Sequence, residues 1–356
     1  MMHEVYMRRC LELAQKGKGN VSPNPMVGAV LVHNGHIIGE GWHREYGQAH
    51  AEVNCIDSVA VEDKHLIPDC TMYVSLEPCA HHGKTPPCAN RLVQEKIKHV
   101  VICNTDPYEK VGGRGIQILT ENNIQTTVDV LEQQGRWLNR RFFCTQENKR
   151  PYIILKWAQS ANGIFAPYGN KRHQISNAFS NQSVHKWRTE EDAIMVGTNT
   201  ALADNPQLTA RLWQGKNPLR IVIDRSLILP HNLHLFDRKV NTWIVNDKKD
   251  EMCNNLNYLH FDFDESMLDN LMNKLYEANI QSVIIEGGAK LLNNFIAKGL
   301  WDEARVFTSD KAIAHGLAAP ILTEATAAFE TYLGKDKFQL FVNNNSEYQY
   351  AGGMEL

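Results

Sequence analysis

The stretch SLEPCAHHGKTPPC, Ser75 to Cys88, decides the fold of the N-terminal part of the chain. It contains two cysteines and two histidines, and it overlaps the end of TMYVSL, an apolar run that predicts a buried strand. Its two adjacent prolines suit the first turn of a helix that continues past Cys88. Cys79 is therefore expected where a strand ends and Cys88 where a helix begins. Such positions converge at one edge of an α/β sheet, so the sequence predicts that the two thiols meet.

A third candidate ligand lies upstream, in GQAHAEVNC, where His50 begins a predicted helix. One imidazole and two thiolates are three zinc ligands, and they leave the fourth tetrahedral position open, as in catalytic zinc sites. Glu52 is not needed as a ligand and is placed to transfer a proton. His-x-Glu followed by Pro-Cys is typical of zinc nucleobase deaminases, so the predicted reaction is hydrolytic deamination of an amino-heterocycle.

Two other interpretations of these residues stay open. In the first interpretation, the cysteines are buried thiols that bind no metal and His50 is a surface residue. In the second, the zinc site is closed and structural, with His81 or His82 as its fourth ligand. A closed site would release no ammonia from a substrate.

Composition limits the class of protein. A chain of 356 residues exceeds the size of one hydrophobic core, so two domains are expected. The formal charge is −3, and no basic stripe occurs, so no nucleic-acid partner is expected. No apolar run is long enough to span a membrane, and the N-terminus is unlike a signal peptide. The eight cysteines are expected to be reduced, in a cytoplasmic protein.

Strand and helix patterns alternate throughout the chain, which predicts a layered α/β fold. Asn34-Gly35 predicts a hairpin turn, residues 131–143 predict one helix, and VNNNSEYQYAGG (342–353) predicts a closing strand with loops. TQENKRP, Thr145 to Pro151, is the candidate linker. The expected domains are residues 1–146 and 150–356.

The second half contains no Gly-x-Gly-x-x-Gly between its first strand and helix, so a Rossmann fold is not favoured. SVIIEGGAKLLNNF, starting at Ser282, places two glycines between a buried strand and a helix. This pattern suits phosphate binding at a helix N-terminus, and equally a turn that needs glycine for packing.

The chain resembles the family of bifunctional riboflavin-biosynthesis deaminase/reductases. The motifs that carry this resemblance are SPNPMVGAVLV (22–32), GWHREYGQAHAE (41–52), EPCAHHGKTPPC (77–88), YIILKWAQSANGIFA (152–166), DAIMVGTNTALADNPQLTAR (192–211) and IIEGGAKLL (284–292). The resemblance implies a cytidine-deaminase-like three-layer domain followed by a dihydrofolate-reductase-like domain. It also implies zinc-dependent deamination of 2,5-diamino-6-ribosylamino-4(3H)-pyrimidinone 5′-phosphate, and then NADPH-dependent reduction of the ribosyl group, which gives 5-amino-6-ribitylaminouracil 5′-phosphate.

The resemblance further implies roles for individual residues. Zinc ligands would be His50, Cys79 and Cys88, and Glu52 would be the catalytic acid and base. The deaminase substrate would contact Asn24, His43, His81 and Lys84. The reductase substrate would contact Lys156, Arg172, Arg188, Leu208, Arg211 and Glu286. NADPH would contact Gln174, Thr200, Asp204, Gly288, Ala289, Lys290, Leu291, Leu292, Asn293 and Asn294, with Arg225 as a candidate ligand for its 2′-phosphate.

The chain departs from the family pattern in three places. Arg172 stands where the family commonly has Ser, Gln174 where it has Trp, and DPYEKVGG keeps Asp106 but lacks an Asn. The first two departures indicate either a variant reductase pocket, which we favour, or a weakened reductase. A monofunctional deaminase whose second domain binds or dimerises therefore remains an alternative. A nucleic-acid-editing deaminase is disfavoured by the charge and by the nine-residue cysteine spacing. Homo-oligomerisation is left open.

Overall fold

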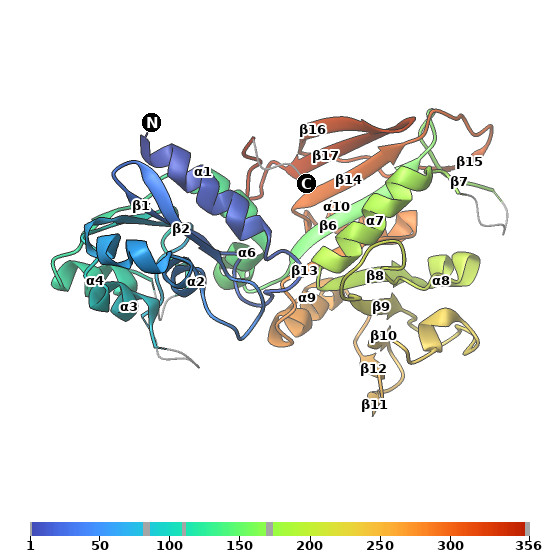
Figure 1. Ribbon diagram of the computed structural model, residues 1–356. Helices are drawn as coiled ribbons and strands as arrows, with labels where there is room; N and C mark the ends of the chain where they lie inside the picture. The colour runs from blue at the N-terminus through green and yellow to red at the C-terminus, as the bar shows by residue number, and fades with distance from the viewer. Residues whose placement is uncertain (1, 81–85, 109–111, 169–173, 353–356) are drawn as a thin grey trace. The chain divides into compact units, whose positions relative to one another are not determined.

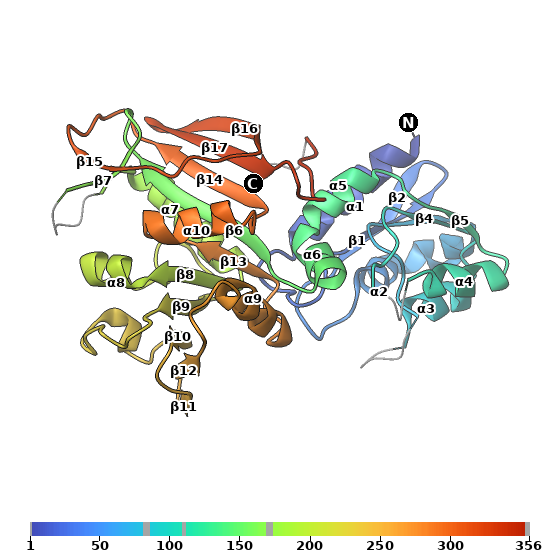
Figure 2. The same ribbon diagram turned by 180° about the vertical axis from the view of Figure 1, so that it is seen from behind.

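Figures 1 and 2 show a computed structural model of the chain, which describes residues 2–80, 86–108, 112–168 and 174–352. The chain forms two compact units, Met1–Asn148 with Tyr350–Leu356, and Lys149–Gln349. The passage between them lies inside the predicted linker. Thr145 to Asn148 belong to a helix, however, so the irregular segment is shorter than expected. None of the helices in the described ranges is long and apolar enough to cross a membrane.

The first unit contains a sheet with strand order β2-β1-β3-β4-β5, in which β1 is antiparallel to both neighbours and β3, β4 and β5 are parallel. Its elements are α1 Met2–Gln15, β1 Gly28–His33, β2 His36–Trp42, α2 Ala51–Asp57, the 3-10 helix η1 Val61–Asp69, β3 Thr71–Val74, α3 Cys88–Gln94, β4 His99–Ile102, α4 Arg114–Glu121, β5 Gln125–Thr127, α5 Glu132–Leu138 and α6 Arg140–Asn148.

This unit has three layers, because its strands bury alternate residues on both faces. Ala29 and Leu31 of β1 pack on one face with apolar residues of α2, α3 and α4. Val30 and Val32 pack on the other face with α1. A Cβ at Gly28 would lie 2.0 Å from the carbonyl oxygen of Cys10 in α1, so only glycine allows this helix to approach so closely. The predicted three-layer domain is confirmed.

Local chain geometry agrees with the sequence at one turn and differs at one helix. Asn34 and Gly35 both have positive φ, as a type I′ hairpin turn requires. The single helix predicted over residues 131–143 is instead two helices, α5 and α6, separated by Asn139. The Asn139 side chain bonds to both the backbone N–H and the carbonyl of Met26, each over 2.8 Å. A contact distant in sequence therefore fixes the break.

The second unit contains a ten-stranded sheet with strand order β11-β12-β10-β9-β8-β13-β6-β14-β17-β16, parallel from β12 to β14, and a two-stranded sheet of β7 and β15. Its elements are β6 Tyr152–Gln159, β7 Ile164–Pro167, α7 Ala178–Glu190, β8 Ala193–Gly197, α8 Thr198–Asp204, β9 Leu219–Ile223, the 3-10 helix η2 His234–Phe236, β10 Thr242–Asn246, β11 Glu251–Cys253, β12 Leu256–His260, α9 Met267–Glu277, β13 Ser282–Ile285, α10 Ala289–Ala297, β14 Glu303–Thr308, β15 Gly316–Ala318, β16 Ala325–Leu333 and β17 Asp336–Asn343.

Helices cover the central strands of the large sheet on both faces (Figure 1). Apolar residues of α9 and α10 form one core with β6, β8 and β13. On α7, Trp187 stacks on Phe307 of β14 at a centroid distance of 5.5 Å. The closing strand with loops predicted over residues 342–353 corresponds to the end of β17 at Asn343, and the described residues after it, 344–352, form turns and irregular segments. The α/β class is confirmed for both units.

Candidate functional site

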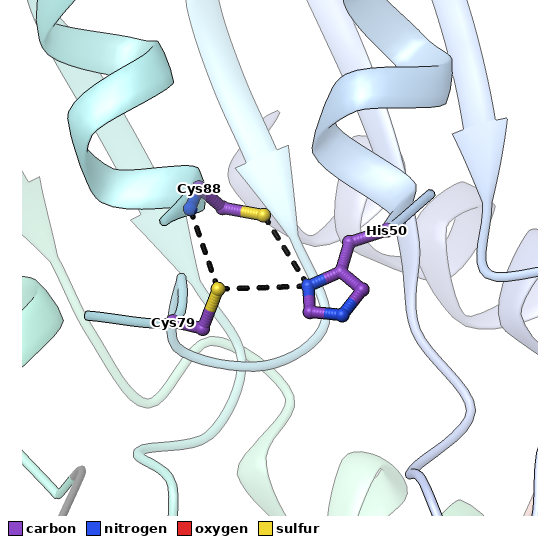
Figure 3. A group of neighbouring side chains, drawn as sticks. All are labelled: His50, Cys79 and Cys88. Carbon is purple, nitrogen blue, oxygen red and sulfur yellow. Dashed lines mark hydrogen bonds between the residues drawn. The ribbon is translucent and has the colours of Figure 1, made fainter. Parts of the chain in front are cut away.

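Three elements of the first unit bring the predicted metal ligands together (Figure 3). His50 is the N-cap of α2, Cys79 follows β3, and Cys88 is the first residue of α3. Nδ1 of His50 lies 3.5 Å from Sγ of Cys79 and 3.4 Å from Sγ of Cys88. All three ligand atoms lie within 4.8 Å of one another. The sequence-based convergence at one sheet edge is confirmed.

The spacing of these atoms fits a tetrahedral zinc ion. Zinc binds sulfur at about 2.3 Å and imidazole nitrogen at about 2.0–2.1 Å, which places two such ligands roughly 3.5 Å apart. Both nitrogen-to-sulfur distances match this value. The donor set has three members, as catalytic zinc sites have. His81 and His82, the candidates for closing the site, lie outside the described residues.

Glu52 lies in the first turn of α2 and is 3% exposed. Burial raises the pKa of its carboxyl to about 7, against the lowering effect of the His50 charge. A carboxyl with a pKa near neutrality can both accept and release a proton at working pH. The position of Glu52, two residues after a ligand, is what its predicted role requires.

Asn24 and His43 form a hydrogen-bonded pair beside the metal ligands. Nδ1 of His43 donates to the carbonyl of Ala49 over 3.1 Å, which leaves Nε2 as acceptor for Nδ2 of Asn24 at 3.2 Å. Burial lowers the pKa of His43, which favours the neutral ring. Its ring lies edge-on to that of His50, with centroids 5.4 Å apart. Both predicted substrate residues are therefore near the ligands, whereas His81 and Lys84 lie outside the described residues.

Sequence reasoning missed Glu77, which is buried and stands two residues before Cys79. Its carboxylate accepts four backbone N–H groups, at distances between 2.8 and 3.3 Å. The donors are Asp106, Gly113, Gly115 and Ile116. The carboxylate thus holds the start of α4 and the segment before it against the end of β3. An acid directly before Pro-Cys was the available signal.

In the second unit, Glu286 follows β13 and lies between two cations. Nη2 of Arg188 donates to its Oε2 over 2.8 Å, and Nζ of Lys156 lies 3.9 Å from its Oε1. Burial acts to raise the pKa of Glu286, but the charges of Arg188 and Lys156 lower it below its ordinary value. Burial lowers the pKa of Lys156. Three predicted substrate residues therefore form one buried charge cluster.

A cavity of about 260 Å³ adjoins this cluster. Its lining includes the predicted residues Arg188, Leu208 and Arg211, together with His185 and His234. The buried guanidinium of Arg220 supports one wall by donating to the carbonyls of Gln207 and His234, over 3.4 and 3.1 Å. Sequence reasoning predicted neither His185 nor Arg220, because each stands in an ordinary helix or strand pattern.

The predicted cofactor loop lies against α8. A Cβ at Gly287 would come within 2.9 Å of Cγ2 of Thr200, and Gly288 has φ +72, so both glycines are required there. Leu291 and Leu292 point into the core, so only their backbone could face a cofactor. The remaining predicted residues of this group vary in exposure: Ala289 is buried, Asp204 is half-buried, and Lys290, Asn293 and Asn294 are exposed.

Arg225 and Gln174 do not line the cavity. Arg225 donates from Nε to Asp247 over 2.8 Å, and its side chain is 62% exposed. Gln174 is exposed and donates to the carbonyl of Ser176 over 3.2 Å. Arg172 lies outside the described residues.

Comparison with known proteins gives matches to both units. Residues 1–104 match the cytidine and deoxycytidylate deaminase zinc-binding region, and residues 151–326 match the RibD C-terminal domain. The riboflavin biosynthesis protein RibD of Aquifex aeolicus is 36% identical over 318 residues, 88% of each chain. The RibD of Escherichia coli is 32% identical over 330 residues, 88% of this chain and 89% of the other.

Solved structures show the same similarity. The diaminohydroxyphosphoribosylaminopyrimidine deaminase/5-amino-6-(5-phosphoribosylamino)uracil reductase of Thermotoga maritima superposes with a TM-score of 0.88 at 32% identity, over 96% of this chain and 99% of that chain. RibD of Acinetobacter baumannii superposes with a TM-score of 0.86 at 28% identity, over 96% and 98% of the two chains.

Proposed function

The chain belongs to the RibD family of riboflavin biosynthesis deaminase/reductases, and from this premise we propose which of its residues perform the two reactions. It is a bifunctional enzyme that acts on a small molecule and uses zinc and NADPH. We assign deamination to residues 1–146 and reduction to residues 150–356, of which Tyr350–Leu356 group with the first unit. The single observation that carries the deaminase assignment is the convergence of one imidazole and two thiols beside a buried carboxyl.

In the deaminase, His50, Cys79 and Cys88 would hold the metal. Zinc, when bound, supplies a Lewis acid that lowers the pKa of water to about 7. Glu52 accepts the proton of the attacking water and delivers it to the leaving 2-amino group of 2,5-diamino-6-ribosylamino-4(3H)-pyrimidinone 5′-phosphate, which departs as ammonia. The raised pKa of Glu52 supports this role, because a carboxyl whose pKa lies near the working pH can both accept a proton from water and release it to the leaving group.

We assign the orientation of the substrate in the deaminase to Asn24, His43, His81 and Lys84. Because Nε2 of His43 already accepts from Asn24, the free Oδ1 of that amide is the group suited to accept from a ring N–H. Lys84 suits the substrate phosphate by its charge.

In the reductase, Arg188 and Arg211 are suited to the substrate phosphate, because guanidinium groups bind phosphate by paired hydrogen bonds. Lys156, Arg172, Leu208 and Glu286 complete the substrate site. NADPH supplies a hydride for C1′ of the opened sugar. Thr200, Asp204 and the first turn of α10 would hold this cofactor, with the backbone N–H groups of that turn facing its phosphates. Gln174 and Arg225 are assigned to the same site.

We place the enzyme in the cytoplasm, because none of its eight cysteines, all of which lie in the described ranges, forms a disulfide, as in a reducing compartment. We expect no nucleic-acid partner, since the charge is −3 without a basic stripe. Assembly into a homo-oligomer is compatible with these assignments.

One coupled assay tests the assignments and the alternative of a monofunctional deaminase. Zinc-loaded protein is given the diaminopyrimidine phosphate, and ammonia release is followed before NADPH is added. We expect one ammonia and then one NADPH consumed per substrate. Ammonia without NADPH consumption would favour the monofunctional alternative, and no ammonia would contradict the deaminase assignment.

A further inference from the structure

His185 is a buried histidine that has no role in the deamination and reduction steps proposed for this enzyme. It lies on α7 and is 4% exposed, yet it lines the cavity that contains Arg188 and Arg211. Asn181, His185 and Arg188 are four and three residues apart, so they form one stripe of the helix. The members of this stripe face the cavity together.

The hydrogen bonds of His185 identify its tautomer. Nδ1 accepts the backbone N–H of Arg211 over 2.9 Å, and that of Leu212 over 3.4 Å. A ring nitrogen that accepts carries no proton, so the proton of the neutral ring is on Nε2. Burial and the charges of Arg188 and Arg211 lower the pKa of His185 to about 4, against the raising effects of the Glu286 charge and of a hydrogen bond to the backbone of Thr209, in agreement with a neutral ring.

These contacts also fix the position of Arg211. The ring holds the backbone N–H of Arg211, and the guanidinium of Arg211 donates from Nη1 to Oγ1 of Thr209 over 2.9 Å. Arg188 has its Nη1 and Nη2 engaged by Thr209 and Glu286. The cavity is therefore lined by two guanidinium groups and the neutral imidazole of His185.

We propose that His185 is a phosphate-binding residue of the reductase, which donates from Nε2 to the substrate phosphate while Nδ1 positions the segment that carries Arg211. The inference rests on the proposed function, which places a phosphate beside Arg188 and Arg211. A neutral N–H donor suits this place, because it adds a directed hydrogen bond without a third positive charge.

Two substitutions of His185 distinguish the roles of its two ring nitrogens. In His185→Asn the amide lies near the position of Nδ1, so it retains an acceptor for the Arg211 N–H but offers no donor at Nε2. In His185→Gln the amide reaches the position of Nε2 and retains the donor. The substrates are 5-amino-6-ribosylaminouracil 5′-phosphate and the corresponding riboside without phosphate.

We expect His185→Asn to lower the ratio of kcat/KM for the phosphate over the riboside by about tenfold, mostly through KM, since a hydrogen bond to a charged group is lost. His185→Gln, which keeps the donor but lacks the Nδ1 acceptor for the Arg211 N–H, should restore only the part of this ratio that depends on the donor. Ammonia release from the diaminopyrimidine phosphate by the same samples should be unchanged, because the deaminase residues lie in the other unit.

An unchanged ratio in His185→Asn would overturn the proposal, as would an equal loss for both substrates, which indicates a purely structural role. Titration with inorganic phosphate in a calorimeter keeps the test independent of turnover. The wild type should bind phosphate more tightly than His185→Asn, and equal affinities would contradict the proposal. Failure of the wild type to oxidise NADPH would instead contradict the proposed reductase function.

Discussion

Arg188 donates from Nη2 to Oε2 of Glu286 over 2.8 Å, and both side chains are about nine-tenths buried. Lys156 approaches the other oxygen of the same carboxylate at 3.9 Å. One carboxylate is therefore the counter-ion of two cations in a site that is largely inaccessible to water. The charge of Glu286 acts to raise the pKa of Lys156, against the lowering effect of burial.

The first prediction concerns Glu286→Gln. The amide retains the shape of the side chain but leaves Arg188 and Lys156 without a counter-charge, and unpaired buried charges are strongly unfavourable. We expect kcat/KM for NADPH oxidation to fall by about tenfold or more, while ammonia release is retained. Glu330→Gln, which removes an exposed ion pair with Lys337 in the same unit, is the control and should leave both rates unchanged. Equal reductase rates in the two variants would contradict the role of the cluster.

The second prediction concerns Glu77, whose carboxylate accepts four backbone N–H groups. In Glu77→Gln an NH2 group replaces one carboxylate oxygen. This donor then faces backbone N–H groups, which are donors too, so these buried N–H groups lose their acceptor. We expect the free energy of unfolding of the first unit to fall by about 3 kcal/mol, measured by urea denaturation. The exposed Glu62 provides a matched control in Glu62→Gln, for which a loss of similar size would contradict this explanation.

The metal site gives the third prediction. Cys88→Ser replaces a thiolate with a much weaker zinc ligand, so the purified protein should contain far less than one zinc per chain. Ammonia release should be lost, whereas NADPH oxidation with 5-amino-6-ribosylaminouracil 5′-phosphate should persist. Metal analysis by mass spectrometry checks the first point. Cys253→Ser, in the second unit, should retain full zinc; a full zinc content in Cys88→Ser would contradict the assignment.

The fourth prediction concerns stability and pH. The pKa of His185 is about 4 in the folded protein and 6.5 in the unfolded chain, so the unfolded chain takes up a proton first as the pH falls. The stabilisation is complete above pH 6.5 and declines as the pH falls towards 4. Urea denaturation across this range should show a steeper decline for the wild type than for His185→Asn. Parallel curves would show that His185 does not titrate in this way.

The sequence predicted the features that depend on neighbouring residues or on strand ends. The Asn34-Gly35 turn and the meeting of His50 with Cys79 and Cys88 belong to this class. Features that depend on contacts between residues distant in the sequence were not predicted. Asn139 ends α5 because it bonds to Met26, which lies 113 residues earlier, and no local pattern contains that information.

Other misses have a different physical origin. The hairpin of β16 and β17 was not predicted, because no residue of β16 is buried and its sequence lacks a clear apolar period. His185 stands in an ordinary helix, and its relevance arises only when the segment after Leu208 folds back onto its Nδ1. Functional residues that act by accepting backbone N–H groups, such as Glu77 and His185, therefore need the tertiary structure to be recognised.

The fifth prediction tests Arg225 as the residue that selects NADPH over NADH. Its guanidinium is bound to Asp247, which also pairs with Lys248 at 2.9 Å. If Arg225 reaches the 2′-phosphate, Arg225→Ala should lower the ratio of kcat/KM for NADPH over NADH by about tenfold, because one charge-assisted bond is lost. Lys248→Ala is the matched control, since it removes a cation from the same carboxylate without removing Arg225. An unaltered ratio in Arg225→Ala would exclude this role, and an equal change in both variants would assign the effect to the general positive charge around Asp247.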